Sequence, residues 1–219
     1  MNKVLACVIT AVVGYLLGCI SMGVIVSRAY AKIDIRKYGS GNAGMTNVMR
    51  TLGWVPGALA FAGDMLKGLL AALIGKWLAG ELGMCIGGLA AILGHDFPVF
   101  LKFKGGKGIS TSFGFILASN WVIALLLIPV QLVFVLTTGL MSLASIASSI
   151  AFAVLAFVFK SSTVYCVTAV IACLLSLFCH RSNIVRLIQG KENKLDHKKI
   201  TEKSKQTANN FKNRKKDGQ

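Results

Sequence analysis

The sequence predicts an all-α integral membrane protein, and three observations lead to that fold class. Of the 219 residues, 55% are hydrophobic and only 15% are charged, whereas about a quarter are charged in a soluble domain. Two runs, Val4–Val26 and Gly108–Phe159, contain no Asp, Glu, Lys, Arg or His. The positive charges gather in a few segments outside these runs. Apolar runs of this length predict helices that cross the roughly 30 Å hydrocarbon core of a bilayer.

The expected membrane helices follow in order along the chain. Val4–Val26 is longer than the roughly 7–15-residue apolar core of a secretory signal peptide, so we interpret it as a membrane helix. A second helix is expected over Gly53–Trp77 and a third over Met84–Phe100, joined by a turn near Glu81. The later apolar blocks are Asn120–Leu136, Met141–Phe159 and Ser161–Cys179.

The net charge is +16, and the distribution of the positive residues along the chain predicts the membrane topology. Twenty of the 24 Lys and Arg residues lie in the ranges 28–50, 102–107 and 181–219. Lys and Arg concentrate on the cytoplasmic side of membrane proteins, so all three ranges are expected there. This places the amino terminus outside and the carboxyl terminus in the cytoplasm.

If consecutive basic segments lie on the same side of the membrane, the chain must cross the membrane an even number of times between them. Between Lys107 and His180 there are three apolar blocks, which is an odd number. Either one block lies on the membrane surface, or the Ser110–Ala118 stretch forms an additional short helix. The total is then five or seven helices. A short helix at membrane depth needs shelter from protein or a water-filled cavity, so a cavity is expected near Ser110.

The first basic segment, Gly39–Arg50, has the composition of a phosphate-binding loop. Its glycines permit positive φ, so that consecutive backbone N–H groups can surround an anion. An arginine offers a bidentate fork matched to phosphate. The candidate binding residues are Ser40, Gly41, Asn42, Thr46, Asn47 and Arg50. The alternative interpretation is an ordinary loop between helices.

The second segment presents Lys107 from a flexible backbone, with candidate binding residues Gly106, Gly108 and Thr111 around it. A basic glycine-rich turn is also typical of any cytoplasmic loop. Nearby His95 is open to a structural or a functional interpretation. The same holds for Asp64 and Lys67, an intramembrane ionisable pair at i and i+3.

The third segment begins at His180, which is the best general-base candidate because it lies at an interface beside cationic residues. In a helix, Asn183 and Arg186 would follow it on neighbouring turns. Together the three segments supply cations and hydrogen-bond donors suited to positioning phosphate-bearing reactants.

The remaining features exclude other chemistry. The six cysteines are scattered through apolar runs without CxxC spacing, so neither a metal site nor a disulfide framework is expected, and no cofactor is predicted. Residues 1–195 form the expected transmembrane domain. Residues 196–219 are expected to be a basic, disordered cytoplasmic tail that contacts anionic lipid headgroups rather than nucleic acid.

Four segments carry a resemblance to a known family. Ile33–Arg50, Asp64–Gly68, Gly94–Thr111 and His180–Glu192 resemble, in order and spacing, the signatures of the bacterial acyl-phosphate:glycerol-3-phosphate acyltransferases. The similarity covers roughly residues 10–195. Two departures are small: Gly-Cys-Ile-Ser replaces Gly-Ser-Ile-Pro at the end of the first helix, and a serine replaces the usual alanine before Thr111.

The resemblance implies a seven-helix enzyme of the bacterial inner membrane, with its active site on the cytoplasmic side. Such an enzyme transfers a fatty acyl group from acyl phosphate to glycerol 3-phosphate and releases phosphate, in phospholipid synthesis. Arg50 and Lys107 would bind the two phosphates, and His180 with Asn183 would orient glycerol 3-phosphate. The remaining binding roles would fall on the residues named above, Arg186 included.

Two other functions fit less well. Acyl-CoA-type acyltransferases use a His-x4-Asp motif, and none of the three histidines has Asp five residues later. A transporter of small phosphorylated anions would also use glycine-rich re-entrant loops. It predicts internal repeats and basic groups on both faces, whereas the basic groups here are on one side.

Overall fold

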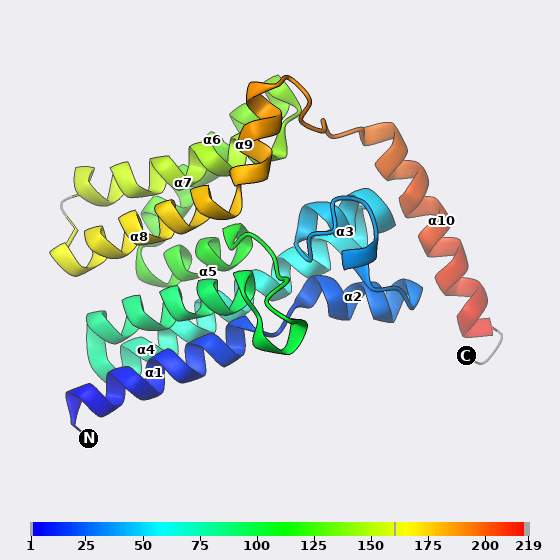
Figure 1. Cartoon of the computed structure of the whole chain (residues 1–219). Coiled ribbons are helices and arrows are strands. Elements are labelled where there is room, and N and C mark those ends of the chain that lie inside the picture. Colours follow the sequence, from blue (N-terminus) through cyan, green and yellow to red (C-terminus); the bar gives the residue numbers. More distant parts are fainter. Residues whose placement is uncertain (1, 160, 217–219) are drawn as a thin grey trace.

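The computed structural model describes residues 2–159 and 161–216, of which residues 211–216 by their backbone only, and within these ranges it contains helices and no strands (Figure 1). The predicted all-α class is confirmed. The α-helices are α1 (Lys3–Gly18), α2 (Met22–Ala31), α3 (Met45–Leu52), α4 (Trp54–Asp96), α5 (Ile109–Ser119), α6 (Trp121–Thr138), α7 (Met141–Val158), α8 (Thr163–Cys179), α9 (Arg181–Ile188) and α10 (His197–Lys216). Short 3-10 helices, η1 (Ile35–Lys37) and η2 (Val99–Leu101), lie in the loops.

Helix α4 is a hairpin of two antiparallel segments. Its backbone leaves the helical conformation at Ala79 and at Gly80, which has a φ of 63°. The two halves then pack face to face. A Cβ added to Gly75 would collide with the carbonyl oxygen of Gly83, so glycine permits this close approach. The reversal lies at the predicted turn, and the two halves correspond to the helices predicted on either side of it.

The first predicted span is not one helix. The run Val4–Val26 is divided between α1 and α2, which are separated by residues 19–21. A break inside an apolar run leaves backbone carbonyls without helical partners. Here the Lys67 ammonium group donates hydrogen bonds to the carbonyls of Gly18, at 2.9 Å, and Ile20, at 2.7 Å. The charged residue on α4 therefore stabilises the break, which the apolar pattern alone could not indicate.

The later helices follow the predicted blocks closely. Helices α6, α7 and α8 correspond to the three apolar blocks after Lys107, and α5 is the additional short helix that was one of the two alternatives for Ser110–Ala118. Helix α5 is sheltered by α4: Gly68 lies against the carbonyl of Thr111, and Gly114 lies against that of Met65. By length and composition, four helical stretches could span a membrane, or five if the bent α8–α9 pair is one span. The count of seven and the orientation of the termini stay predictions.

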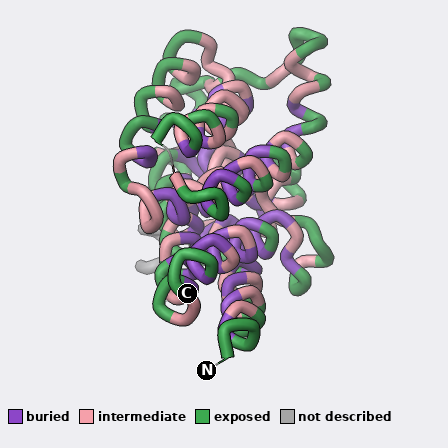
Figure 2. The backbone as a smooth tube through the Cα atoms, turned by 90° about the vertical axis from the view of Figure 1, so that its left-hand side faces the viewer, coloured by how far each residue is buried: buried purple, intermediate pink, exposed green. Residues whose placement is uncertain are grey.

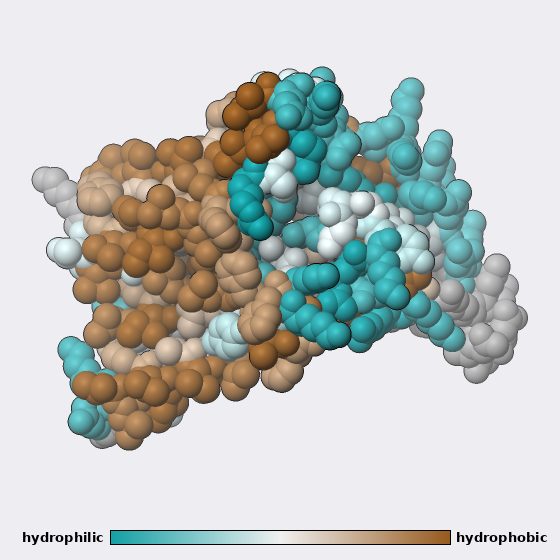
Figure 3. Space-filling model, viewed as in Figure 1, coloured by the Kyte–Doolittle hydropathy of each residue, from teal (hydrophilic) through white to brown (hydrophobic). Residues whose placement is uncertain are grey.

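The surface is divided into an apolar part and a polar part. Buried residues lie on the inner sides of the helices (Figure 2). The outward side chains of the bundle are largely apolar, including Leu136 on α6 and Phe157 on α7, which are 75% and 59% exposed. In Figure 3 the hydrophobic surface covers the left of the molecule, and the hydrophilic surface covers the end where α2, α3 and α10 lie. This division is typical of a protein embedded in lipid with one large polar end.

The tail differs from the predicted disorder, because residues 197–216 form α10, which packs on α3. Ile200 is only 2% exposed. The Ser204 hydroxyl accepts a hydrogen bond from the Trp54 backbone N–H at 2.9 Å, and the His197 ring stacks on the Trp54 ring. A buried apolar side chain, a hydrogen bond to the start of α4 and a ring stack therefore hold this otherwise polar segment against the bundle.

Candidate active site

Asn47, the third residue of α3, holds the first glycine-rich loop in shape. Its Oδ1 accepts a hydrogen bond from the backbone N–H of Ser40 at 2.9 Å. Its Nδ2 donates to the carbonyl oxygens of Ile35, Tyr38 and Asn42. Gly39 lies against this amide with a φ of 57°. Because the loop uses every polar atom of the Asn47 side chain, the structure gives this residue a loop-shaping role.

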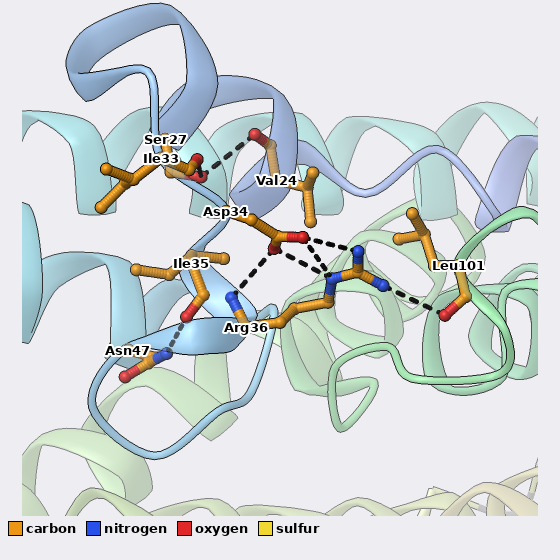
Figure 4. A network of polar contacts seen from close by, with 8 residues as sticks. All are labelled: Val24, Ser27, Ile33, Asp34, Ile35, Arg36, Asn47 and Leu101. Carbon is orange, nitrogen blue, oxygen red and sulfur yellow. Dashed lines mark hydrogen bonds and ion pairs between the residues drawn. The ribbon is translucent and has the colours of Figure 1, made fainter.

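A hydrogen bond from Arg36, which precedes this loop, reaches the backbone just before the second basic segment (Figure 4). Arg36 pairs with Asp34 at 2.7 Å and donates from Nη1 to the carbonyl of Leu101 at 3.1 Å. The hydrogen bond from Arg36 lowers the pKa of Asp34 to about 2. The pair therefore keeps both charges across the physiological range and joins two loops that are distant in sequence.

The second loop packs directly on the first. The carbonyl of Gly105 accepts hydrogen bonds from the Ala43 N–H and the Asn42 side chain, both at 3.3 Å. The Gly106 N–H donates to the carbonyl of His95 at 2.9 Å. A Cβ at Gly106 would overlap the His95 ring. These contacts fix the backbone immediately before Lys107.

Lys107 connects the second segment to the third by donating a hydrogen bond to Oδ1 of Asn183. The Asn183 amide in turn donates to Oε1 of Glu192 at 2.8 Å, and Arg186 donates to Oε2 at 2.7 Å. Burial lowers the pKa of Lys107 to about 8, although Glu192 opposes the shift. Burial raises the pKa of Glu192, but hydrogen bonds from Asn183, Arg186 and Ser142 outweigh it, and the pKa is lowered overall.

Two further candidates from the sequence lie at this cluster. Arg50 on α3 donates to the carbonyl of Asn193 at 2.9 Å, and its Nε is buried without a hydrogen-bond partner among the described residues. Burial lowers the pKa of Arg50. His180, 3% exposed, lies between α8 and α9 with Nδ1 2.9 Å from the carbonyl of Ser176. A carbonyl only accepts, so Nδ1 carries the proton, which leaves Nε2 of the neutral ring able to accept one.

One cavity of about 410 Å³ contains these groups and has two chemically different ends. Its polar end is lined by nine of the predicted site residues: Ser40, Asn42, Thr46, Asn47, Arg50, Lys107, His180, Asn183 and Arg186. Its mainly apolar end lies between α5, α6, α7 and α8, where Ile116, Leu127, Phe152 and Cys173 line it together with Gln131, Ser145, Ser148 and Ser149. A polar anion-binding end that continues into an apolar arm suits a ligand with a charged head and a hydrocarbon chain.

Four predicted residues do not line the cavity. Gly41 is an exposed turn residue with a φ of 74°, and Gly106 packs on His95. Gly108 has a φ of 72° and lies against Asp96, while Thr111 is fully buried with its backbone against α4. The three glycines therefore shape the loops that carry the cavity residues, and Thr111 packs the start of α5 on α4.

Comparison with known proteins identifies the family. The family model described as glycerol-3-phosphate acyltransferase matches residues 8–190. A glycerol-3-phosphate acyltransferase of Thermoanaerobacter pseudethanolicus is 46% identical over 191 residues, covering 87% of this chain and 96% of the relative. One from Clostridioides difficile is 40% identical over 203 residues, covering 90% and 99%. The chain belongs to the glycerol-3-phosphate acyltransferase family.

Crystal structures agree with this assignment to the glycerol-3-phosphate acyltransferases. The glycerol 3-phosphate form of PlsY (YgiH), an integral membrane glycerol 3-phosphate acyltransferase, superposes with a TM-score of 0.84 at 36% identity, covering 89% of this chain and 98% of that one. The lysophosphatidic acid form gives a TM-score of 0.82. The fold is therefore that of an integral membrane acyltransferase, as predicted, and the transporter alternative loses its support.

Glu192 and Ser142 are among the cavity residues that were not predicted from the sequence. Glu192 accepts hydrogen bonds from Ser142, Asn183 and Arg186, and both Glu192 and Ser142 line the cavity. A lone carboxylate six residues after Arg186 in a strongly basic segment was the available signal for Glu192. Ser142 had no signal, because it lies in an apolar helix rich in serine.

Proposed function

We propose that the protein transfers a fatty acyl group from acyl phosphate to the 1-hydroxyl of glycerol 3-phosphate. The products are 1-acylglycerol 3-phosphate (lysophosphatidate) and inorganic phosphate. The observation that supports this proposal most directly is that one cavity has both a cationic end and a mainly apolar arm. The two PlsY neighbours, in glycerol 3-phosphate and lysophosphatidic acid forms, agree with it.

The polar end has enough positive charge for two phosphates. Arg50, Lys107 and Arg186 contribute three cations, and Glu192 is the carboxylate among the cavity-lining residues. With a pKa of about 8, Lys107 is mostly protonated at neutral pH, and a bound phosphate would favour its charged form further. Arg50 and Lys107 are the proposed phosphate ligands, and His180 with Asn183 is proposed to orient the glycerol 3-phosphate.

The apolar arm is the proposed site of the acyl chain. Its wall on α7 runs from Ser142 to Phe152 and includes three further serines whose hydroxyls already donate hydrogen bonds within the protein, Ser145, Ser148 and Ser149. Its second wall runs from Ala172 on α8 to His180, directly after that helix. Ten residues of helix correspond to about 15 Å. A fatty chain that lies along this arm would place its carbonyl carbon at the cationic end, beside the second substrate.

The chemistry needs positioning more than a nucleophilic side chain. The 1-hydroxyl oxygen of glycerol 3-phosphate attacks the acyl carbonyl carbon, an ester C–O bond forms, and the C–O bond to the phosphoryl group breaks. The leaving phosphate is a good leaving group, so no acyl-enzyme intermediate is needed. The hydroxyl proton passes to Nε2 of His180 or to a substrate phosphate. Cationic groups stabilise the charge that collects on the departing phosphate.

The site is proposed to face the cytoplasm from the bacterial inner membrane. The three basic segments meet at one end of the bundle, where lipid-facing apolar surface ends (Figure 3). Single cysteines at Lys37, Lys104 and Lys191, in a background without the native cysteines, should react with an impermeant reagent only after the cells are opened. A cysteine at Glu81 should react in intact cells. Any of the first three labelled from outside would contradict this orientation.

The function is tested with detergent-purified protein, glycerol 3-phosphate and either palmitoyl phosphate or palmitoyl-CoA. We expect phosphate release and lysophosphatidate formation with palmitoyl phosphate, and no product with palmitoyl-CoA. A reaction without glycerol 3-phosphate corrects for donor hydrolysis. Acyl transfer from palmitoyl-CoA alone would contradict the proposed donor.

A further inference from the structure

A buried polar cluster lies beside the cavity, and the proposed reaction gives it no role. Asp64 and Lys67 on α4 form an ion pair at 2.7 Å, and the side chains are 1% and 6% exposed. His95, near the end of α4, approaches both: its Nδ1 is 2.8 Å from the Lys67 ammonium nitrogen and 3.4 Å from Oδ1 of Asp64. His95 also lines the cavity.

The Lys67 ammonium group determines which nitrogen of the His95 ring carries the proton. Its three N–H bonds are shared among four neighbouring atoms, namely the carbonyl oxygens of Gly18 and Ile20, Oδ1 of Asp64, and Nδ1 of His95. An ammonium group only donates, and two N–H donors do not approach to 2.8 Å, so Nδ1 of His95 accepts through its lone pair. The neutral imidazole then carries its proton on Nε2.

The Nε2–H of His95 lies at the phosphate-handling loop. A Cβ at Gly106 would overlap Nε2, so this nitrogen lies alongside the backbone next to Lys107. The carbonyl of His95 receives the Gly106 N–H at 2.9 Å, which ties residue and loop together. Nε2 has no hydrogen-bond partner among the described residues.

We infer that His95 is a further substrate-binding residue, which donates its Nε2–H to a phosphate oxygen held beside Lys107. Lys67 and Asp64 are positioning residues that act through the ring, by keeping Nδ1 an acceptor and Nε2 a donor. The inference rests on the proposed function, since it deepens the assignment of the same cavity. The ligand is a phosphate group, either that of acyl phosphate or that of glycerol 3-phosphate.

Two substitutions of His95 distinguish hydrogen-bond donation to a phosphate from a role in packing alone. His95→Asn keeps a polar atom near Nδ1, where it can still accept from Lys67, and removes the donor toward the cavity. His95→Gln places an amide N–H near the position of Nε2. The exposed His197 provides the control substitution His197→Asn.

The measurements are kcat and KM for palmitoyl phosphate and glycerol 3-phosphate, with Tm for each variant. A lost hydrogen bond to a charged group predicts a fall of about 10- to 100-fold in kcat/KM for His95→Asn. His95→Gln should stay within about threefold of the unsubstituted protein, and His197→Asn should match it. A raised KM for glycerol 3-phosphate assigns that phosphate, whereas a lowered kcat or a raised KM for palmitoyl phosphate assigns the donor phosphate. Equal losses in both His95 variants, or no loss in His95→Asn, would overturn the inference.

Nitrogen NMR of the detergent-solubilised protein gives a readout that does not depend on turnover. With ¹⁵N-labelled histidine, the His95 ring should show a protonated Nε2 and an unprotonated Nδ1, and Nε2 should shift when inorganic phosphate or glycerol 3-phosphate is added. A protonated Nδ1, or a ring unaffected by both anions, would overturn the inference even if His95→Asn failed to fold. The two experiments can fail independently. If no phosphate is released in the donor assay but the NMR spectrum shows this tautomer and shift, the proposed reaction is wrong and the anion-binding role of His95 stands.

Discussion

Lys107 donates a hydrogen bond from its ammonium group to the side-chain oxygen of Asn183, 76 positions later in the chain. This contact joins the loop before α5 to the helix after the α8 bend, and Glu192 extends it through the Asn183 amide. Since both residues line the polar end of the cavity, the contact brings the second and third basic segments to one site.

Replacing Lys107 should remove most activity. Lys107→Met keeps the length of the side chain but loses the charge beside Arg50 and Arg186, so we expect kcat/KM to fall by about 100-fold or more. Phosphate release from palmitoyl phosphate measures the effect. The exposed Lys104 lies in the same loop, and Lys104→Met should retain near-normal activity. Equal losses in the two variants would indicate a general effect of loop charge instead.

The activity of the free enzyme should decrease as the pH rises through about 8. Lys107 has its pKa lowered to about 8, so it is charged below that pH and becomes neutral above it. A neutral amine attracts phosphate less, and kcat/KM for glycerol 3-phosphate should fall on the alkaline side. In Lys107→Arg the charge persists, so this alkaline decrease should disappear. A decrease unchanged in that variant would assign it to another group.

Glu192 should be needed to arrange the cations rather than to react. It accepts hydrogen bonds from Asn183, Arg186 and Ser142, and Glu192→Ala would leave the first two without their partner. We expect a loss of about 10-fold or more in kcat/KM and a Tm lower by a few degrees. Ser142→Ala, which removes only one of the three donors to Glu192, should have a smaller effect on both quantities. Full activity in Glu192→Ala would refute the role.

The effect on stability of replacing Asp64 or Lys67 should depend strongly on whether the other residue of the pair is still present. Lys67→Met leaves the Asp64 carboxylate buried and unpaired, and it also removes the donor to Gly18 and Ile20. A loss of roughly 3–5 kcal/mol in stability is expected. In the double variant Asp64→Leu/Lys67→Met no charge is stranded, so its Tm should lie above that of Lys67→Met. If the stability losses of the two single variants simply add in the double variant, Asp64 and Lys67 are not coupled.

Helix α10 should stabilise the protein without taking part in the reaction. Ser204→Ala removes the acceptor for the Trp54 N–H at the start of α4, which predicts a cost of about 1 kcal/mol. Thermal unfolding of this variant is compared with that of Glu202→Ala, whose side chain is exposed on the same helix. Acyl transfer should persist in both variants. A Tm unchanged by Ser204→Ala would show that α10 does not dock through this contact.

The sequence by itself predicted the features that depend on local composition. Uncharged runs such as Gly108–Phe159 are long enough to require a membrane, and the grouping of Lys and Arg indicated that the three basic segments share one side. The four signature-like segments predicted the family, and nine of the thirteen predicted site residues line the cavity. These inferences need only neighbouring residues, because hydropathy and backbone freedom are local properties.

Only the tertiary structure decided how the buried polar groups are satisfied. The break after Gly18 depends on Lys67, 49 positions away, and the roles of Asn47 and Glu192 depend on which carbonyls and amides surround them. The tautomer of His95 depends on Lys67 in the same way. A buried polar group must find its partner wherever the fold places one, so its role follows from long-range packing and not from its neighbours in sequence.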